Sequence, residues 1–392
     1  MQARKTFLSF APPLIGQEEI DAVVDTLRTG WLTTGPKTQQ FEREFAKRFQ
    51  APAALALNSC TAGLHTALVA LGIGKGDEVI TTCLTFAATV NVIEHVGATP
   101  VLVDVEPDTL NLDPDLVERA ITPRTKAILP VHFAGHPVDL DAISTLAQRR
   151  RLAVIEDAAH AVGAVYRGRP IGSGNHPTLF SFYATKNMTT GEGGMLTADE
   201  ELISQARIIS LHGMSREAWN RYQRGGSWQY DVVTPGFKYN MTDLQASLGL
   251  CQLHRLTDFQ RRRKEIAHSY TRAFREFDEL EVPTCRPDVV HAWHLYVLRL
   301  RSKGLNIDRD RFIDSLTNKN IGTSVHFIPI HLHSYYRAKY GYRETDYRTA
   351  YQNFQRMLSL PLHPGMTDQD VDDVIEAVCD TIRQLRTGAR AA

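Results

Sequence analysis

Short apolar runs alternate with helical patterns along the first half of the chain. Nearly continuous apolar runs are typical of strands that are buried on both faces of a largely parallel sheet. Seven runs are predicted to be strands, at residues 53–58, 78–82, 100–104, 126–133, 152–157, 178–183 and 194–197. Helical patterns separate most of them, which predicts an α/β fold with helices on both faces of a mostly parallel seven-stranded sheet.

Two amphipathic helices are predicted before the first strand. The first ends near Gly30 and the second begins after Thr38. Each repeats apolar residues three or four positions apart, which is the pattern of one buried helix face. These apolar residues are Ile20, Val23, Val24 and Leu27 in the first helix and Phe41, Phe45 and Phe49 in the second.

The pattern changes near Leu256. The expected elements are a helix over 257–277, a strand over 289–299, a helix over 308–319, a strand over 323–328 and a last helix from Thr367. Because 392 residues exceed what one compact core usually serves, we expect two domains. Residues 1–255 are expected to form an N-terminal segment and a large domain, and residues 256–392 a smaller C-terminal α+β domain.

The balance of charge argues against a nucleic acid or an anionic membrane as the partner. Lys plus Arg and Asp plus Glu number 44 each, so the formal net charge is zero. The densest basic run is Arg261-Arg-Arg-Lys264, which lies in a helical stretch. We interpret this run as a solvated helix face.

Neither a disulfide framework nor a metal site is indicated. The five cysteines are widely spaced and include no C-x-x-C pair. His326, His331 and His333 lie close together in the sequence, but no carboxylate or cysteine completes a ligand set, so no metal is expected. The chain has no apparent secretory leader and no apolar stretch long enough to span a bilayer, so a reduced, cytoplasmic location is expected.

Two segments carry the residue types that pyridoxal phosphate (PLP) chemistry needs. Lys186 lies 29 positions after Asp157, which ends a predicted strand. An amine can hold the cofactor aldehyde as a Schiff base, and a carboxylate can keep the pyridine nitrogen protonated. Asp157 alone could equally cap the following helix. The order and spacing of the two residues in an α/β pattern predict a PLP site, in which burial should lower the pKa of Lys186.

Other strand ends could complete this site. The run 58–63 (Asn-Ser-Cys-Thr-Ala-Gly) opens a helix, and is either a cradle for the cofactor phosphate or an ordinary helix cap. Phe86 follows the second strand and either stacks on a flat ring or packs in the core. His160 either contacts the cofactor ring or has a structural role. The hydroxyl of Ser181 could reach a phosphate oxygen.

Ordered motifs along nearly the whole chain resemble those of one enzyme family. They extend from Gly30-Trp31-Leu-Thr-Thr-Gly35-Pro36 to Ser359-Leu-Pro-Leu-His-Pro364. The chain resembles the nucleotide-sugar aminotransferases of PLP fold type I, often called the DegT/StrS family. Within that family it is most similar to the enzymes that make UDP-4-amino-4-deoxy-L-arabinose, through the runs 121–128, 154–161, 291–294 and 321–327.

The resemblance implies roles for individual residues. Lys186 is the catalytic Schiff-base lysine, and Asp157 pairs with the pyridine nitrogen. Phe86 stacks on the cofactor ring, and His160 lies beside the 3-hydroxyl of that ring. A homodimer with shared active sites is also implied. The residues expected to hold the phosphate are Thr61, Ala62 and Ser181 of one chain and Lys238 of the other.

The sequence differs from the family pattern at several site positions. The family usually has Gly-x-Asn-Tyr-Arg where this chain has Gly236-Phe-Lys238-Tyr-Asn240, so Lys238 replaces the asparagine that contacts the phosphate. Phe86 and Tyr183 stand where the arabinose-type enzymes tend to have Trp and His, so no pentose substrate is assigned. The candidate substrate-binding residues are Trp31, Tyr183 and His326.

The activity implied by the resemblance is PLP-dependent transamination in amino-sugar biosynthesis, as for a polysaccharide or a lipopolysaccharide. An amino group passes from an amino acid, glutamate in most of the family, to a keto group of a nucleotide-linked sugar, with the 4-keto position expected. Two alternatives stay open: a PLP-dependent nucleotide-sugar dehydratase, and a non-catalytic regulatory protein. The dehydratases commonly have His in place of the lysine, whereas this chain has Lys186. The sequence contains neither a helix-turn-helix pattern nor a basic patch that would support a regulatory protein.

Overall fold

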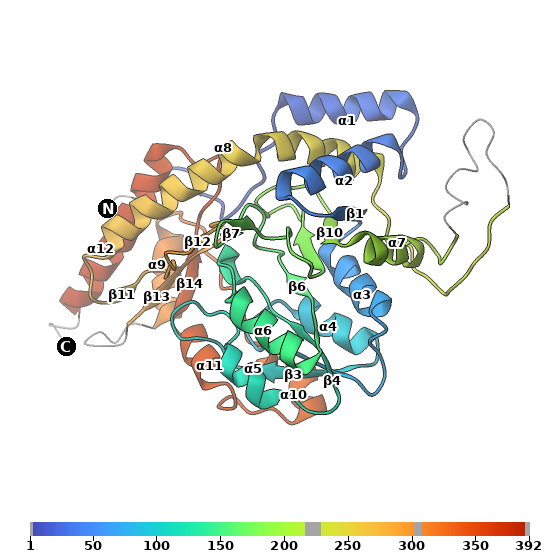
Figure 1. The fold of residues 1–392 in the computed structure, drawn as a ribbon. Helices are drawn as coiled ribbons and strands as arrows, with labels where there is room; N and C mark the ends of the chain where they lie inside the picture. The colour runs from blue at the N-terminus through green and yellow to red at the C-terminus, as the bar shows by residue number, and fades with distance from the viewer. Residues whose placement is uncertain (1–2, 216–228, 302–307, 389–392) are drawn as a thin grey trace.

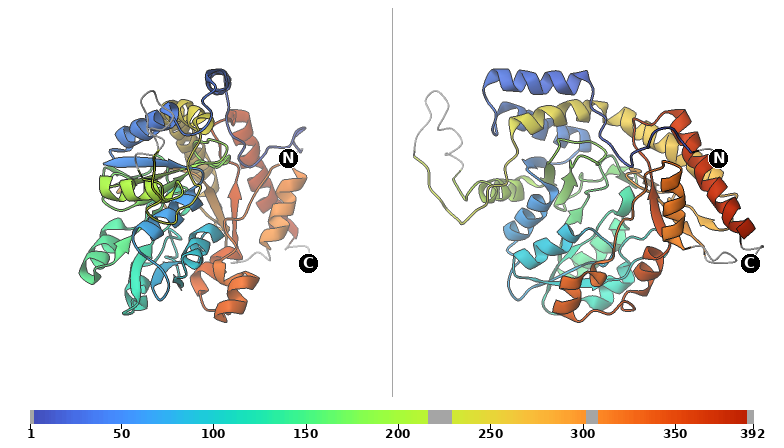
Figure 2. Two further views of the ribbon diagram at one scale, coloured as in Figure 1. Left: turned by 90° about the vertical axis from the view of Figure 1, so that its right-hand side faces the viewer. Right: turned by 180° about the vertical axis from the view of Figure 1, so that it is seen from behind.

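The computed structural model describes residues 3–215, 229–301 and 308–388 of the chain. These residues form a large α/β part and a smaller C-terminal part. Helix α8 (Asp243–Phe274) extends over both (Figure 1). Figure 2 shows from two further sides that helices lie on both sides of the sheet in the large part. The architecture expected from the sequence, a helix-covered sheet followed by a smaller α+β part, is observed.

The central sheet of the large part contains the seven predicted strands. β5 and β6 are separated only by Ile155 and together make the single strand predicted over 152–157. The order is β1-β10-β9-β6 and then β5-β4-β2-β3, and within this sheet β10 is the antiparallel strand. The strands are β1 (Ala53–Leu57), β2 (Glu78–Thr82), β3 (Thr99–Val103), β4 (Thr125–Leu129), β5 (Ala153–Val154), β6 (Glu156–Asp157), β9 (Thr178–Ser181) and β10 (Gly194–Ala198).

Helices cover both faces of this sheet because its strands bury apolar side chains on both faces. On one face, Val79 and Leu129 pack with residues of α3, α4 and α7. On the other face, Ile80 packs with α5 and α6, and Phe180 packs with α2 and α8. The helices are α2 (Pro36–Phe49), α3 (Cys60–Ala70), α4 (Ala87–His95), α5 (Pro114–Ala120), α6 (Leu140–Arg150) and α7 (Glu200–Ile209).

Helix α1 (Gln17–Thr29) packs against α8 through polar residues rather than through its apolar stripe. Glu19 is buried, accepts a hydrogen bond from Gln252 at 2.7 Å and forms an ion pair with Arg255 at 2.5 Å. Ile20 and Leu27, expected on a buried face, are 49% and 53% exposed. The predicted helix is observed, and its other two apolar residues, Val23 and Val24, are half-buried, so the stripe is only partly covered; periodicity identifies an apolar stripe but not what covers it. The stripe predicted for α2 is buried.

Helix α8 begins at Asp243, well before the predicted start at 257. Thr242 and Gln245 form a capping box at its N-terminus. Close packing against α2 requires glycine at position 249, where a Cβ would lie 2.7 Å from the Phe41 ring. The expected domain boundary between 255 and 256 falls inside this helix, and it remains a prediction. In the described part of the chain, no helix combines the length and the apolar character needed to cross a membrane.

The small part is built on a three-stranded antiparallel sheet with the order β11-β13-β14. The strand predicted over 289–299 is divided, because residues 291–295 turn toward the large part, where the Ala292 N–H donates to the Gly135 carbonyl at 2.9 Å. The strand predicted over 323–328 is wrong: that segment contributes a single bridge, from Ser324 to Ser359 of the unpredicted β14. The elements are β11 (Leu280–Glu281), β12 (Val289–Val290), β13 (Tyr296–Leu300), β14 (Met357–Leu360), α9 (Arg309–Asn318) and α12 (Asp368–Gly388).

Shorter elements connect the two parts. β12 of the C-terminal half pairs with β7, which in turn pairs with β8. Helix α10 lies against α4, where the Tyr336 hydroxyl donates to Asn91 Oδ1 at 2.5 Å. These elements are β7 (Val165–Tyr166), β8 (Arg169–Pro170), α10 (Ser334–Tyr340), α11 (Arg348–Phe354) and the 3-10 turns η1 (Phe133–Gly135) and η3 (Ile330–Leu332).

Candidate active site

A cavity of about 540 Å³ lies at the carboxyl ends of β1, β2, β6 and β9. This edge of an open α/β sheet is where ligands usually bind, and the volume suits a small-molecule site. The small part closes the cavity with His294, His326 and Phe327, and the N-terminal segment adds Phe10. The predicted site residues that line it are Thr61, Phe86, Asp157, His160, Ser181, Tyr183, Lys186 and His326.

Three predicted site residues do not line this cavity. Ala62 is buried, and its N–H donates to Ser59 Oγ at 3.0 Å. Lys238 is exposed, and its ammonium donates to Asn240 Oδ1 at 2.6 Å. Trp31 is also exposed, in the turn after α1. The roles expected of these three residues stay predictions.

Asp157 ends β6 and is almost fully buried. Its two carboxylate oxygens accept hydrogen bonds from the Thr89 hydroxyl at 2.8 Å and from the Ala159 N–H at 3.0 Å. Burial raises the pKa of Asp157, while these two hydrogen bonds and the nearby Lys186 act in the opposite direction. A cationic ring N–H beside this carboxylate would stabilise its charged form further.

Lys186 follows the carboxyl end of β9, and its ammonium group opens on the cavity. No hydrogen bond joins Nζ to any residue in the described part of the chain. Withdrawal from bulk water lowers the pKa of Lys186 from 10.5 to about 8, although Asp157 acts in the opposite direction. A substantial neutral fraction is therefore present near physiological pH, as a nucleophile and base requires.

Three histidines around the lysine are neutral. The rings of His160 and His294 are in contact, with centroids 4.4 Å apart and planes inclined by 40°. Burial, with a smaller contribution from Lys186, holds the pKa of His160 well below its usual value and lowers that of His326 to about 4. Burial likewise holds the pKa of His294 well below its usual value. The histidines therefore add polar atoms to the cavity without adding positive charge.

Asn187 links the segment that contains Lys186 to the small part. Its amide donates to the Ala292 carbonyl at 2.8 Å, and its Oδ1 lies 3.0 Å from His294 Nδ1. Because Oδ1 is an acceptor, His294 must carry its proton on Nδ1. Asn187 thus fixes the tautomer of one cavity-lining histidine and directly follows Lys186.

The predicted phosphate cradle lies at the N-terminus of α3. Ser59, Cys60 and Thr61 line the cavity there, and Ser181 approaches from the end of β9. The N-terminus of an eleven-residue helix favours an anion. A Cβ at position 194 would lie 2.5 Å from the Cys60 backbone nitrogen, so only glycine lets β10 pass this close to the cradle.

These residues fit PLP. His160 Nδ1 is buried and has no hydrogen-bond partner among the described residues, so the cavity offers a polar atom that a ligand can satisfy. Phe86 is 63% exposed at the cavity, where an aromatic ring would otherwise be costly to leave uncovered. The cavity thus combines an amine, a buried carboxylate, an uncovered aromatic ring and a helix N-terminus.

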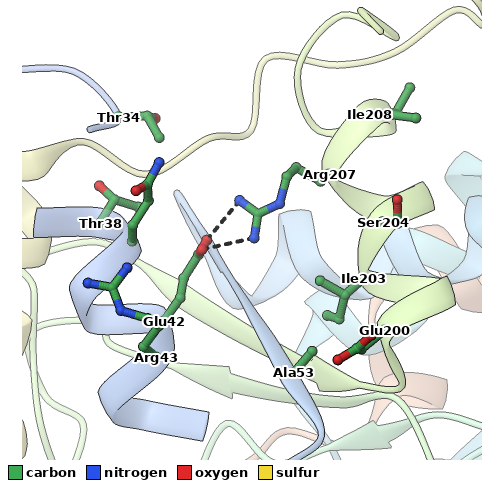
Figure 3. Close-up of a pocket in the computed structure, with 11 residues that line it drawn as sticks. Thr34, Thr38, Glu42, Arg43, Ala53, Glu200, Ile203, Ser204, Arg207 and Ile208 are labelled. Carbon is green, nitrogen blue, oxygen red and sulfur yellow. Dashed lines mark hydrogen bonds and ion pairs between the residues drawn. The ribbon is translucent and has the colours of Figure 1, made fainter. Parts of the chain in front are cut away.

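A second cavity, of about 630 Å³, lies between α2, β1 and α7 (Figure 3). Glu42 and Arg207 form an ion pair across it, with Arg207 Nη2 2.8 Å from Glu42 Oε2. Glu42 also accepts the Ala56 N–H at 2.9 Å. None of the predicted site residues lines this cavity.

Several site residues were not predicted from the sequence. Thr89 lies in the segment after Phe86, and only the fold brings its hydroxyl to Asp157. His294 lies in a run that resembles the family, but its position beside His160 depends on the turn of residues 291–295. Phe10 has no local signal, because it enters the cavity from the distant N-terminal segment.

Comparisons with known proteins identify the family of this chain. The family model described as DegT/DnrJ/EryC1/StrS aminotransferase family matches residues 13–379. The chain is 56% identical to the spore coat polysaccharide biosynthesis protein SpsC of Bacillus subtilis over 385 residues, which cover 98% of this chain and 99% of SpsC.

Solved structures extend the similarity to the whole fold. Spr1654 of Streptococcus pneumoniae, solved in its PMP-form, superposes with a TM-score of 0.91 at 39% identity, covering 96% of this chain and 100% of that one. Its PLP-form gives a TM-score of 0.90. The sugar aminotransferase CalS13 of Micromonospora echinospora has a TM-score of 0.86 at 31% identity, covering 95% of this chain and 99% of that one. The chain therefore belongs to the DegT/DnrJ/EryC1/StrS aminotransferase family, with the PLP fold type I architecture, and is a PLP-dependent sugar aminotransferase.

Proposed function

We propose that this enzyme moves the amino group of glutamate to the 4-keto group of a nucleotide-linked sugar. The observation that carries the proposal is the environment of Lys186, whose amine has a pKa of about 8, has no hydrogen-bond partner among the described residues and lies in the same cavity as the buried Asp157. Family membership supports a sugar as the acceptor. The similarity to a spore coat polysaccharide biosynthesis protein supports a role in supplying an amino sugar to a polysaccharide.

Each residue has a separate task in this proposal. PLP, when bound, supplies an aldehyde that condenses with amines and an electron-withdrawing ring. Asp157 would accept a hydrogen bond from the protonated ring nitrogen, and the Thr89 hydroxyl orients its carboxylate. Lys186 Nζ would take a proton from the α-carbon of the amino donor and deliver it to the C4′ carbon of the cofactor in the same half-reaction. Because the surrounding imidazoles are neutral, they do not raise the cost of a charged Lys186 during that transfer.

The same cavity residues support the proposed placement of the cofactor. The N-terminus of α3 with Thr61 and the hydroxyl of Ser181 would hold the phosphate, and Phe86 would stack on the ring. His160 Nδ1, which lacks a partner, would meet a polar substituent of the ring. Tyr183 and His326, which also line the cavity, would contact the substrate. The arabinose-type subtype, the site role of Trp31 and the cytoplasmic location stay predictions.

We also propose a homodimer in which Lys238 of one chain completes the phosphate site of the other. Lys238 lies outside its own cofactor cavity and is exposed, as a residue that acts in a partner must be. Val232 and Val233, a few residues before it, are exposed as well. Ile20 and Leu27 form a further uncovered apolar stripe on α1, and such stripes are typical of protein interfaces.

The substrate is tested with a panel of UDP-, dTDP- and GDP-linked 4-keto and 3-keto sugars. ¹⁵N-glutamate serves as the donor, and mass spectrometry detects transfer of the label to the sugar. We expect labelled product from a 4-keto sugar together with 2-oxoglutarate. Labelling of 3-keto sugars alone would contradict the proposed position. A visible cofactor band that does not bleach with glutamate would contradict glutamate as the donor.

The shared site is tested by mixing two inactive variants, Lys186→Ala and Lys238→Ala, under conditions of subunit exchange. In a mixed dimer one site would be intact and the other doubly defective. Full exchange should restore about a quarter of wild-type activity, because half of the dimers are mixed and each has one working site. If exchange is demonstrated and no activity returns, Lys238 acts within its own chain.

A further inference from the structure

The basic run 261–264 is not one solvated face. Arg261 and Arg262 form ion pairs with carboxylates, at 2.9 Å and 2.8 Å. Arg263 is buried, and its guanidinium donates to backbone carbonyls. Lys264 instead opens on a groove on the other side of the residue 291–294 segment from the cofactor cavity. The earlier interpretation of the run is therefore incomplete for this lysine.

The groove has a volume of about 680 Å³ and lies between the second half of α8 and the segment 283–293. Its lining contains four cationic residues and two histidines, and it contains no aspartate or glutamate among the described residues. This is unusual in a chain whose formal net charge is zero. The residues used below are Lys264, His268, Arg272, Arg275, Cys285 and Arg286.

Four of these side chains share one face of α8. Residues 264, 268, 272 and 275 are spaced by four, four and three positions, which places them in one row on a helix. With a rise of about 1.5 Å per residue, the row is roughly 16 Å long. Lys264, Arg272 and Arg275 are exposed, and none forms an ion pair with a residue in the described ranges.

The row is more than the usual basic end of a helix. Cations near a helix C-terminus are stabilised by the helix dipole, which accounts for Arg272 and Arg275. The dipole does not account for Lys264, which lies about three turns from the end. It also does not account for Arg286, which reaches the groove from a different segment and pairs with Glu106 at 2.9 Å.

We propose that this groove binds a ligand with linked phosphate groups, such as an oligophosphate or the diphosphate of a nucleotide. Guanidinium groups form paired hydrogen bonds with phosphate oxygens, and an ammonium adds a point charge. A single small anion can contact only neighbouring cations of the row, whereas linked phosphates can contact more of them at once, because the long Lys and Arg side chains can converge on them. The absence of carboxylates from the described lining removes the repulsion that such a ligand would otherwise meet.

The groove is separate from the cofactor site. Trp293 and His291 line the groove, whereas His294 lines the cofactor cavity. The two cavities share no lining residue. In the holoenzyme the cofactor would occupy the cradle at α3, so a phosphate probe would bind outside the cradle, and the groove variants below separate the groove from the substrate site.

Binding is tested by titrating inorganic tripolyphosphate into the holoenzyme in a calorimeter. We expect one site per chain, with an affinity that falls as salt rises. The variant Arg272→Gln/Arg275→Gln should lose about tenfold or more in affinity. The matched control Arg150→Gln/Arg261→Gln removes the same charge outside the groove and should change affinity by less than about twofold. Equal losses in both variants, or no binding to the wild type, would overturn the proposal.

The rate at which Cys285 is alkylated shows whether the ligand binds in the groove itself. Cys285 is exposed in the groove, whereas Cys251 lies outside it. Tripolyphosphate should slow alkylation of Cys285 by iodoacetamide, measured by mass spectrometry, without slowing that of Cys251. The groove variant should lose this protection. Protection by UDP as well would identify a nucleoside diphosphate as ligand, and protection by tripolyphosphate alone a free oligophosphate. Equal protection by orthophosphate would mean a single adventitious anion and would refute the proposal.

Discussion

Two cavities of similar size, one closed by the small part and one within the large part, differ in how their polar groups are hydrogen-bonded. In the cavity between α2 and α7, Glu42 and Arg207 bind each other, and Glu42 also binds the backbone of β1 (Figure 3). In the cofactor cavity, Lys186 has no hydrogen-bond partner in the described part of the chain, and His160 Nδ1 is buried without one. The smaller of the two cavities is the one to which we assign the proposed chemistry.

The difference follows from where each cavity lies on the sheet. The cofactor cavity is at the carboxyl ends of four strands, so Asp157 and Ser181 converge there from separate parts of the sequence. The other cavity lies beside the edge strand β1. There Glu42 of α2 pairs with Arg207 of α7 and accepts a backbone hydrogen bond from β1, which holds both helices against the sheet. Unsatisfied polar groups, rather than volume, therefore identify the functional site.

Of the variants that distinguish the two cavities, Lys186→Ala should lower turnover the most. It removes the covalent anchor and the base together, and turnover should fall by at least about 10³-fold. The fold should be intact, because Nζ makes no hydrogen bond to the described residues. Circular dichroism and steady-state assays test this, with exposed Lys126→Ala as the control. Turnover near that of the wild type would contradict the assignment.

Asp157→Asn should lower turnover by about 10²-fold or more, because an amide cannot stabilise a protonated ring nitrogen. The loss of one charge-assisted hydrogen bond should weaken cofactor binding by only about 1.5–3 kcal/mol. Thr89→Val, which removes one of the two hydrogen bonds to the carboxylate, should act in the same direction but more weakly. Kinetics at saturating PLP and cofactor titrations separate the two effects. Unchanged turnover of Asp157→Asn would exclude this role.

The pKa of Lys186 can be measured in the cofactor-free protein. Carbamylation by cyanate requires the neutral amine, so its rate at Lys186 should reach half its maximum near pH 8 rather than near 10.5. The negative charge of Asp157 raises the pKa of Lys186, so Asp157→Asn should move this midpoint to lower pH. Peptide mass spectrometry reports each lysine separately. A midpoint above pH 10 would mean that the cavity does not desolvate the amine.

Much of the site was predictable because its residues stand at strand ends. Asp157 and Ser181 each end an apolar run, and the carboxyl ends of parallel strands meet at one edge. The seven strands were predictable for the same reason, since buried runs of this kind have few other interpretations in an α/β pattern. The family motifs added the residue roles, such as that of Lys186.

The contributions of the small part were harder to predict. Strand β14 is only four residues long, and the segment 323–328 has the composition of a strand but makes one bridge. The turn at 291–295 depends on a contact with Gly135, far away in the sequence, so no local pattern could place His294 in the cavity. The apolar stripe of α1 was visible, but its exposure depends on the polar packing of Glu19 against α8.

Arg207→Met should give the smallest effect and completes the contrast between the cavities. Methionine replaces the aliphatic stem of Arg207 but not its guanidinium, so it leaves the buried Glu42 without its ion-pair partner. The free energy of unfolding should fall by about 1–3 kcal/mol, while turnover stays close to that of the wild type. Urea titration and steady-state assays measure the two quantities. Adding Glu42→Gln should recover part of the loss, because the double variant no longer leaves a carboxylate unpaired. A fall in turnover comparable with that of Lys186→Ala would show that this cavity takes part in the reaction.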